Sequence, residues 1–164
     1  MSDSDTLDTP EANTEQLLCT LIPIKGKTLI VPQATVGEMA QVAPIFPDNS
    51  GPDWFLGFYS WRNGRVPLLS FEKLNGESVA GINPNGQIAV FNSTGVSDDV
   101  PFIAIPTQGV TKELQVSESD IVDQQQSEHA YEAMTLRVGS EEFVMPDITA
   151  LQKAYAAYAS TRRF

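Results

Sequence analysis

The sequence predicts an all-β protein that ends in one short C-terminal helix. Many short segments rich in β-branched and aromatic residues are bounded by turn residues, which is typical of small barrels or a sandwich. Prolines lie in or at the ends of several of these segments, at Pro23, Pro32, Pro67 and Pro106. Because proline has no N–H to donate, such positions belong at strand edges, bulges or corners. This favours strongly curved sheets over one long flat sheet.

The expected strands are short and spread over the whole chain. They cover residues 17–24, 27–31, 54–61, 65–71, 86–92, 101–107, 110–116, 131–138 and 142–148. Between them, residues 36–44 are expected to hold at most one helical turn, because Gly37 and Pro44 limit its length. Residues 76–86 are rich in Gly, Asn and Pro and are expected to form a long loop. Residues 117–132 are polar and acidic and predict a connector with room for some helix.

The C-terminal segment has the periodicity of an amphipathic helix. Apolar residues recur at spacings of three and four, and either Asp147 or Thr149 is suited to cap the first turn. The apolar stripe consists of Ile148, Leu151, Tyr155 and Tyr158.

The 164 residues are enough for one domain or two small, closely packed halves. Residues 1–15 contain five acidic and no basic residues, so we expect a disordered acidic tail. The folded domain is then expected over residues 16–160, followed by a C-terminal tail at 161–164. The net charge is −11 for the whole chain and −6 for residues 16–164.

Composition and charge exclude several classes of partner. Nucleic acids and anionic membrane surfaces attract basic proteins, so neither is expected to bind this acidic chain. No apolar run reaches the roughly 18 residues of a membrane span, and the N-terminus has no secretory signal pattern. The single cysteine, Cys19, lies in an apolar run, which favours a small buried hydrophobe in a reducing compartment. A cytoplasmic location without membrane insertion is expected.

Candidate catalytic groups are scarce. The one histidine, His129, lies in the acidic connector without a cysteine or second histidine for a metal site. The chain has no nucleophile elbow, no dinucleotide-binding fingerprint and no phosphate loop. We therefore expect no catalytic residue, metal or cofactor, and a binding module rather than an enzyme. The remote alternative is a small hydrolase in which a pocket collects His129 with carboxylates.

The segment GFYSWRNGRVPLLSF, residues 57–71, predicts a β-hairpin. An Asn-Gly pair between two apolar runs is the strongest short-range hairpin signal, since a type I′ turn needs positive φ at both central residues. With Asn63 and Gly64 in those positions, Arg62 and Arg65 face each other beside Trp61, where like charges repel. The tip is then either simply solvated, or one arginine pairs with a carboxylate of a partner protein.

These residues resemble the CheW-like family of chemotaxis coupling proteins, over roughly residues 16–160. In the family, a glycine, a few apolar residues and Asn-Leu-Arg-Gly precede a Pro-Val-x-Asp-Leu strand. Here the matching positions are Gly57, Arg62, Pro67, Leu68 and Phe71.

Three further segments resemble the family in the same order along the chain. KTLIVPQATVGEMAQVAPIFP resembles an apolar strand followed by Val-x-Glu-Val/Ile, with Val36, Glu38 and Met39 on the motif. PFIAIPTQGVTKELQVSESDI resembles the Gly-Ile-Val-Val-Asp-x-Val strand and the loop that follows it. EEFVMPDITAL resembles the closing Leu-Asp-x-x-x-Leu segment, with Asp147 and Leu151 on it.

The chain also departs from the family pattern. Asn63 stands where the family has the glycine after the arginine, and Ser70 and Gln108 replace two aspartates. This blurred pattern is similar to accessory coupling proteins of chemosensory systems that control type IV pili and twitching motility, especially the ChpC type.

The resemblance implies two small five-stranded, barrel-like halves packed around a shared core. It also implies an adaptor without catalysis that couples the cytoplasmic tip of chemoreceptors to a CheA-type histidine kinase, and that is a monomer outside the signalling array. The alternative is a modulator that binds only the kinase or only the receptors.

The protein-binding residues implied by the resemblance, together with the hairpin tip, are Val36, Glu38, Met39, Trp61, Arg62, Arg65 and Val110. Val110 falls on the second half, near the groove between the halves. For Val36 and Met39, ordinary core positions remain the alternative. Glu38 is expected to be exposed or bonded to a cation, with Arg62 as the candidate.

Overall fold

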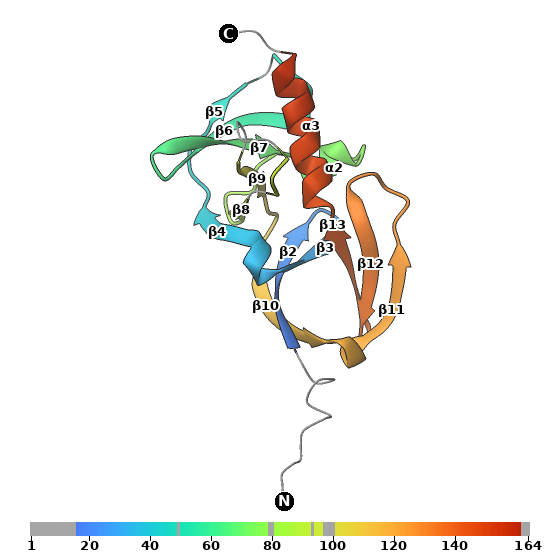
Figure 1. The fold of residues 1–164 in the computed structure, drawn as a ribbon. Helices are drawn as coiled ribbons and strands as arrows, with labels where there is room; N and C mark the ends of the chain where they lie inside the picture. The colour runs from blue at the N-terminus through green and yellow to red at the C-terminus, as the bar shows by residue number, and fades with distance from the viewer. Residues whose placement is uncertain (1–15, 49, 79–80, 93, 97–100, 162–164) are drawn as a thin grey trace, which may run out of the picture.

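The fold consists of two six-stranded sheets and a C-terminal helix (Figure 1). The structure is a computed structural model and describes residues 16–161 except 49, 79–80, 93 and 97–100. The predicted acidic tail, residues 1–15, and residues 162–164 of the predicted C-terminal tail lie outside the described residues. In the part of the chain that is described, no helix is long and apolar enough to cross a membrane.

The first sheet joins the N-terminal strands to the C-terminal third of the chain. In spatial order its strands are β10 (Lys112–Ser117), β2 (Gln16–Ile24), β3 (Lys27–Pro32), β13 (Glu141–Pro146), β12 (Glu132–Val138) and β11 (Ile121–Gln126). All neighbours are antiparallel except β13 and β3, which are parallel. The two edge strands, β10 and β11, are consecutive in sequence and are linked by the short helix η2 (Glu118–Asp120).

The second sheet is built from the middle of the chain. In spatial order its strands are β4 (Val36–Gln41), β8 (Gln87–Phe91), β9 (Ile103–Pro106), β7 (Gly64–Leu69), β6 (Phe55–Trp61) and β5 (Phe46–Pro47). A short helix, η1 (Gln33–Thr35), leads from β3 into β4, and another, α2 (Phe71–Leu74), follows β7. Only β7 and β9 pair in parallel.

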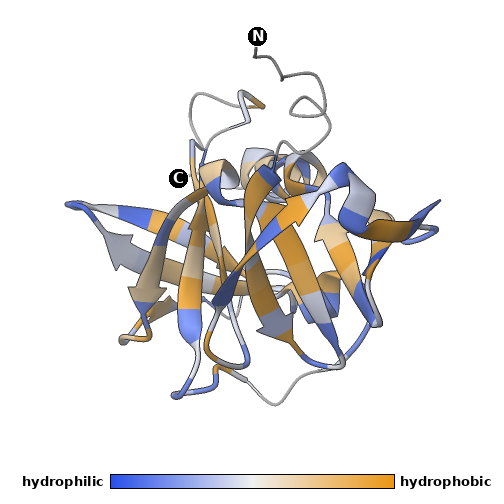
Figure 2. Cartoon of the chain, turned by 90° about the horizontal axis from the view of Figure 1, so that it is seen from below, coloured by the Kyte–Doolittle hydropathy of each residue, from blue (hydrophilic) through white to orange (hydrophobic). Residues whose placement is uncertain are grey.

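Buried side chains form one core shared by both sheets and one smaller core inside each sheet. The shared core joins Ile22 and Leu29 of the first sheet to Phe55 and Phe91 of the second. The private cores centre on Leu68 in the second sheet and on Ile30, Cys19 and neighbours in the first. Figure 2 shows the apolar residues along the middle of the strands and hydrophilic residues at the turns. The expectation of two halves around a shared core is confirmed.

The predicted C-terminal helix is α3 (Ile148–Ser160), and it packs on the shared core. The Asp147 side chain accepts a hydrogen bond from the backbone N–H of Ala150 at 3.0 Å, which satisfies one of the free donors of the first turn. Leu151 is fully buried, and the Tyr155 ring lies 5.4 Å from that of Phe55. The cap and the apolar stripe therefore act as predicted.

Each sheet has six strands rather than the five that the resemblance implied, and the strands expected from the sequence pattern left out edge strands. Residues 36–44 were expected to hold a helical turn but contain strand β4, and the predicted connector at 117–132 contains η2 and β11. β4 and β11 are edge strands with largely polar or half-exposed side chains, so they lack the apolar run that identifies an inner strand. The predicted strand at 65–71 ends early because Ser70 caps α2.

Candidate partner-binding surface

The hairpin between β6 and β7 forms where it was predicted, but its turn lies one residue earlier. Trp61 pairs with Gly64 and Ser60 with Arg65, so the central turn residues are Arg62 and Asn63, with φ of 50° and 64°. Asparagine tolerates this left-handed conformation, whereas it costs an arginine of the order of 1 kcal/mol. The prediction that Asn63 and Gly64 are central is therefore wrong by one residue.

The shifted turn separates the two arginines that were expected to face each other. Arg65 stands opposite Ser60, and its guanidinium lies 4.1 Å from the centre of the Phe46 ring. The Arg62 guanidinium instead lies 4.5 Å from the centre of the Trp61 ring. Each cation is thus placed over an aromatic face, which is an attractive arrangement, and the expected repulsion across the strands does not arise.

Glu38 connects the far edge of the second sheet to the hairpin tip. One of its carboxylate oxygens, Oε1, accepts a hydrogen bond from Trp61 Nε1 at 2.9 Å and lies 3.5 Å from Arg62 Nη2. β4 and the hairpin strands are not neighbours in the sheet, so the sheet curls far enough to bring them together. The Trp61 ring also packs against Phe102, with ring centres 5.0 Å apart. The predicted pairing of Glu38 with Arg62 is confirmed.

A β-bulge in β4 sets the position of Glu38. The pairing of β4 with β8 shifts register between Val36 and Glu38, and such bulges commonly redirect a side chain at a functional surface. The intervening Gly37 allows a close approach: a Cβ there would lie 2.9 Å from Asn92 Oδ1. Asn92 in turn donates a hydrogen bond to the carbonyl oxygen of Ala34 at 2.8 Å. The glycine and the bulge together hold the start of β4 in place.

A groove of about 500 Å³ runs between β4, at the edge of the second sheet, and β10, at the edge of the first. It brings together three of the predicted binding residues, and Val110, which is 68% exposed, directly precedes its far wall. The groove is lined by Thr20, Gln33, Val36, Gly37, Glu38, Met39, Thr111, Lys112 and Glu113. Val36 and Met39 also pack against the shared core, in agreement with the alternative that they are core positions, and their role in protein binding stays a prediction.

Hydrogen bonds within the groove and from the neighbouring strand β8 hold its lining residues in place. Gln87 Oε1, on β8, accepts from the backbone N–H and the hydroxyl of Thr111 at 2.9 and 2.8 Å. Gln33 Nε2 donates to Glu113 Oε2 at 3.0 Å. The groove is therefore a formed feature of the fold, with apolar, acidic and basic side chains within reach of one ligand.

Sequence reasoning missed Phe46 and Phe102, the aromatic partners of the hairpin. Phe46 lies on the two-residue strand β5, where no periodicity is available to identify it. Phe102 directly precedes β9 and packs on the private core of the second sheet. Both contacts depend on how the sheet curls, which a local pattern does not encode.

The remaining candidate groups lie away from this surface. His129 is exposed in the loop between β11 and β12, where its backbone N–H donates to Ser127 Oγ at 3.1 Å. Cys19 is buried as expected, and burial raises the pKa of its thiol. Among the described residues, no cluster of three His, Cys, Asp or Glu side chains is placed to hold a metal ion.

Comparisons with known proteins place this geometry in context. The family model described as CheW-like domain matches residues 19–154. The crystal structure of the scaffolding protein TtCheW from Thermoanaerobacter tengcongensis superposes with a TM-score of 0.67 at 12% sequence identity, covering 80% of this chain and 89% of that chain. At this identity the likeness concerns the fold. Comparison with curated protein sequences finds no significant match.

Proposed function

Because the chain belongs to the CheW-like domain family, we propose that it is a non-enzymatic adaptor of chemotaxis-type signal transduction. In this proposal it couples the cytoplasmic tip of chemoreceptors to a CheA-type histidine kinase, works in the cytoplasm and is a monomer outside the signalling array. The family match over residues 19–154 is the observation that carries the proposal. The mechanism is affinity and geometry, with no bond chemistry.

The finer assignment rests on the departures from the family pattern. Asn63, Ser70 and Gln108 differ from the residues typical of the family, as in accessory coupling proteins of the ChpC type. We therefore extend the proposal to a chemosensory system that controls type IV pili and twitching motility. Ser70 caps helix α2 through its hydroxyl, which accepts from Lys73 N at 3.2 Å, a role that the family's aspartate would fill equally well.

The groove between β4 and β10 supports one protein contact. Val36 and Met39 supply apolar area, Glu38 supplies a fixed carboxylate, and Val110 is an exposed apolar side chain next to the far wall. Interface anchors are typically well-packed apolar side chains surrounded by polar groups that exclude water. An α-helix of a receptor hairpin suits such a groove, because its apolar face repeats at the spacing that a linear groove accepts.

The hairpin offers a second contact close to the groove. On one side, Arg62 and Trp61 contact Glu38, which lines the groove. A partner bound in the groove would therefore also lie next to this side of the hairpin. On the other side, Arg65 lies over Phe46, and no carboxylate of a described residue lies within salt-bridge distance of it. Arginine and aromatic residues are enriched at interface hot spots. We therefore propose that Arg65 binds a carboxylate of a partner.

A binding titration tests the proposal. The full chain is mixed with a CheA-type kinase from the same cell, with and without a receptor's cytoplasmic hairpin, and complexes are measured by calorimetry and size-exclusion chromatography. We expect a ternary complex, which Arg62→Glu weakens at least tenfold because it places two carboxylates side by side at the hairpin. Lys153→Glu makes the same charge change on the exposed side of α3 and serves as the matched control.

Each other outcome has a distinct meaning. Binding to the kinase alone, or to the receptor alone, would replace the adaptor by the modulator. Absence of binding to both would limit the family likeness to the fold. Turnover of a substrate that His129→Ala abolishes would favour the remote hydrolase alternative instead.

A further inference from the structure

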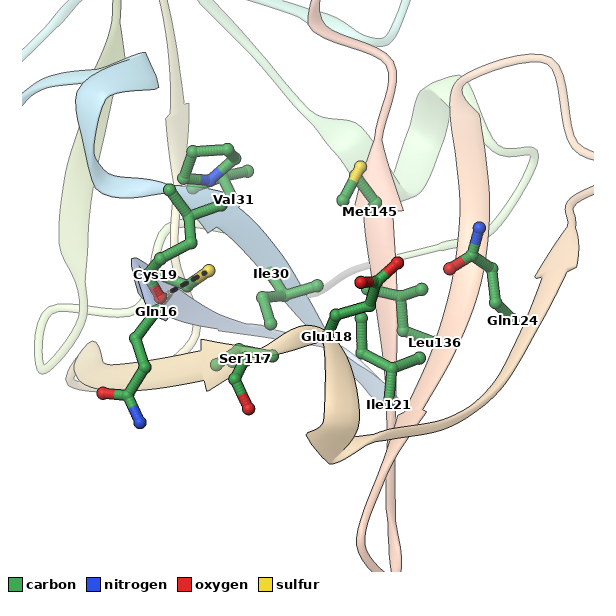
Figure 3. Close-up of a pocket in the computed structure, with 13 residues that line it drawn as sticks. Gln16, Cys19, Ile30, Val31, Ser117, Glu118, Ile121, Gln124, Leu136 and Met145 are labelled. Carbon is green, nitrogen blue, oxygen red and sulfur yellow. Dashed lines mark hydrogen bonds between the residues drawn. The ribbon is translucent and has the colours of Figure 1, made fainter. Parts of the chain in front are cut away.

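The first sheet encloses a cavity at the gap between its two edge strands. β10 and β11 are not paired with each other but are joined by η2, and a cavity of about 420 Å³ opens beside this helix (Figure 3). Small-molecule sites in proteins usually occupy roughly 300–1,000 Å³, so the volume falls in their range. The cavity is lined by Gln16, Leu17, Cys19, Ile30, Val31, Pro32, Val116, Ser117, Glu118, Ile121, Gln124, Leu136 and Met145.

The walls of this cavity are mostly apolar, with polar side chains from Gln16, Ser117, Glu118 and Gln124, and part of them belongs to the private core of the first sheet. Cys19, Ile30 and Leu136 are each at least 95% buried and pack with Val116 in one cluster. An apolar ligand here would displace water from the surface of Leu17, Ile121 and Met145 that stays accessible to solvent, at about 25 cal/mol per Å². The second sheet and the groove take no part in the lining, so the cavity is separate from the surface proposed to bind receptors.

Among the residues that the structure describes, Glu118 is the one charged residue that lines the cavity, and it is exposed to solvent. Figure 3 shows its side chain extending from η2 toward Leu136, and no described residue donates a hydrogen bond to its carboxylate. The neighbouring hydroxyl of Ser117 is already bonded to Asp120 Oδ2 at 3.0 Å. A carboxylate beside an apolar cavity favours a ligand with a cationic or hydrogen-bond-donating head and disfavours an anion.

From this combination we propose that the cavity is a binding site for a small apolar amine. Its hydrocarbon part would contact Leu17, Ile121 and Met145, and its ammonium group would pair with Glu118. The net charge of −11 acts in the same direction, because it attracts cations and repels anions over the whole surface. The inference goes beyond the adaptor function and does not depend on it.

Three probes with one hydrocarbon chain and different heads test the proposal. Decylamine, decanol and decanoate are titrated below their micelle concentrations into the full chain labelled with ¹³C at the methyl groups of Met, Leu and Val. We expect saturable shifts of the Met145 and Leu136 methyl signals. Decylamine should bind several-fold more tightly than decanoate, because the exposed Glu118 carboxylate attracts the ammonium group and repels the carboxylate of decanoate. Glu118→Gln should abolish most of that ratio while decanol binding stays the same.

A matched pair of variants places the binding in the cavity. Ile121→Trp puts a large ring into the mouth of the cavity, and Val122→Trp puts the same ring on the neighbouring residue, which does not line the cavity and is 67% exposed. We expect loss of decylamine binding in the first variant and retention in the second. Absence of saturable shifts, equal binding of all three probes, or equal shifts at the exposed Val110 would overturn the proposal, as would binding that persists in Ile121→Trp. If the cavity accepts only a side chain of a protein partner, no saturable shifts would be seen with any of the three probes.

Discussion

Two ion pairs in this molecule lie in opposite surroundings. Lys27 and Glu132 are 21% and 3% exposed, with Lys27 Nζ 2.9 Å from Glu132 Oε2. Arg62 and Glu38 are 67% and 44% exposed, with a 3.5 Å separation between Arg62 Nη2 and Glu38 Oε1. Removing one partner of a buried pair leaves an uncompensated charge, whereas exposed pairs contribute little to stability. The first pair therefore stabilises the fold, and the second lies on the surface that we propose to bind partners.

The hydrogen-bond partners of Glu132 strengthen this contrast. Besides Lys27, its carboxylate accepts from Asn75 Nδ2 at 2.8 Å and from Ser127 Oγ at 2.9 Å. Asn75 follows α2, which comes from the second half of the molecule, whereas Lys27 and Glu132 belong to the first sheet. The buried carboxylate thus joins the two halves at a point away from the groove. Glu38, by comparison, joins two parts of the same sheet.

Glu132→Ala should have the largest effect on stability. It removes the acceptor of three hydrogen bonds and leaves Lys27 largely buried without its short contact, so we expect a loss of about 3 kcal/mol in the free energy of unfolding. Urea denaturation followed by tryptophan fluorescence measures it. Glu77→Ala removes the more exposed partner of Lys27, at 3.6 Å, and should cost less than about 1 kcal/mol. Equal losses in the two variants would contradict the distinction between buried and exposed pairs.

The stability contributed by the buried pair should depend on pH. Burial alone would raise the pKa of Glu132, but hydrogen bonds from Lys27 and Ser127 hold it below its usual value. A carboxyl group with a lowered folded-state pKa stabilises above its unfolded pKa, about 4.3, and this contribution disappears as pH falls through the folded-state pKa. For Lys27, burial alone would lower the pKa, but the hydrogen bond to Glu132 outweighs burial, so the pKa of Lys27 is raised. The stability that Lys27 contributes is therefore present at neutral pH and is lost only above about pH 10.4.

We therefore expect the difference in unfolding free energy between the wild type and Glu132→Gln to be constant from pH 6 to 8 and to shrink below about pH 4.3. Denaturation midpoints measured at several pH values test this. A difference that stays the same down to pH 3 would show that the charge of Glu132 contributes nothing.

The two pairs also differ in how much the sequence reveals. Glu38 was matched with Arg62 because an unpaired carboxylate between apolar residues needs a cation, and few cations are available. The partners of Glu132 were not foreseen, since Lys27 and Asn75 are far apart in the chain and meet only when the two halves pack. Helix α3 was predictable because its cap and apolar stripe are local. The register of the hairpin turn was not predictable. The Asn-Gly pattern favours Asn63 and Gly64 as central residues, whereas the contact of Arg62 with the Trp61 ring accompanies a turn one residue earlier.

Two variants of Arg62 separate the effect of its backbone conformation on stability from the effect of its charge on partner binding. Arg62 has positive φ, which glycine adopts without the steric cost that alanine bears. Both Arg62→Gly and Arg62→Ala remove the contact with Glu38, so we expect the glycine variant to be more stable by about 1 kcal/mol while partner binding weakens equally in both. Thermal denaturation and the titration described above give the two readings. A glycine variant no more stable than the alanine variant would argue against strain at Arg62.

Glu38→Gln should have the smallest effect on stability. The glutamine amide keeps an oxygen that can accept from Trp61 Nε1 but loses the ionic contact with Arg62, which at this exposure contributes less than about 1 kcal/mol. We expect an unfolding free energy within about 0.5 kcal/mol of the wild type, an indole N–H signal that remains hydrogen-bonded in ¹⁵N NMR spectra, and partner binding several-fold weaker. A loss as large as that of Glu132→Ala would mean that Glu38 supports the fold rather than the surface, and that the contrast between the two pairs does not hold.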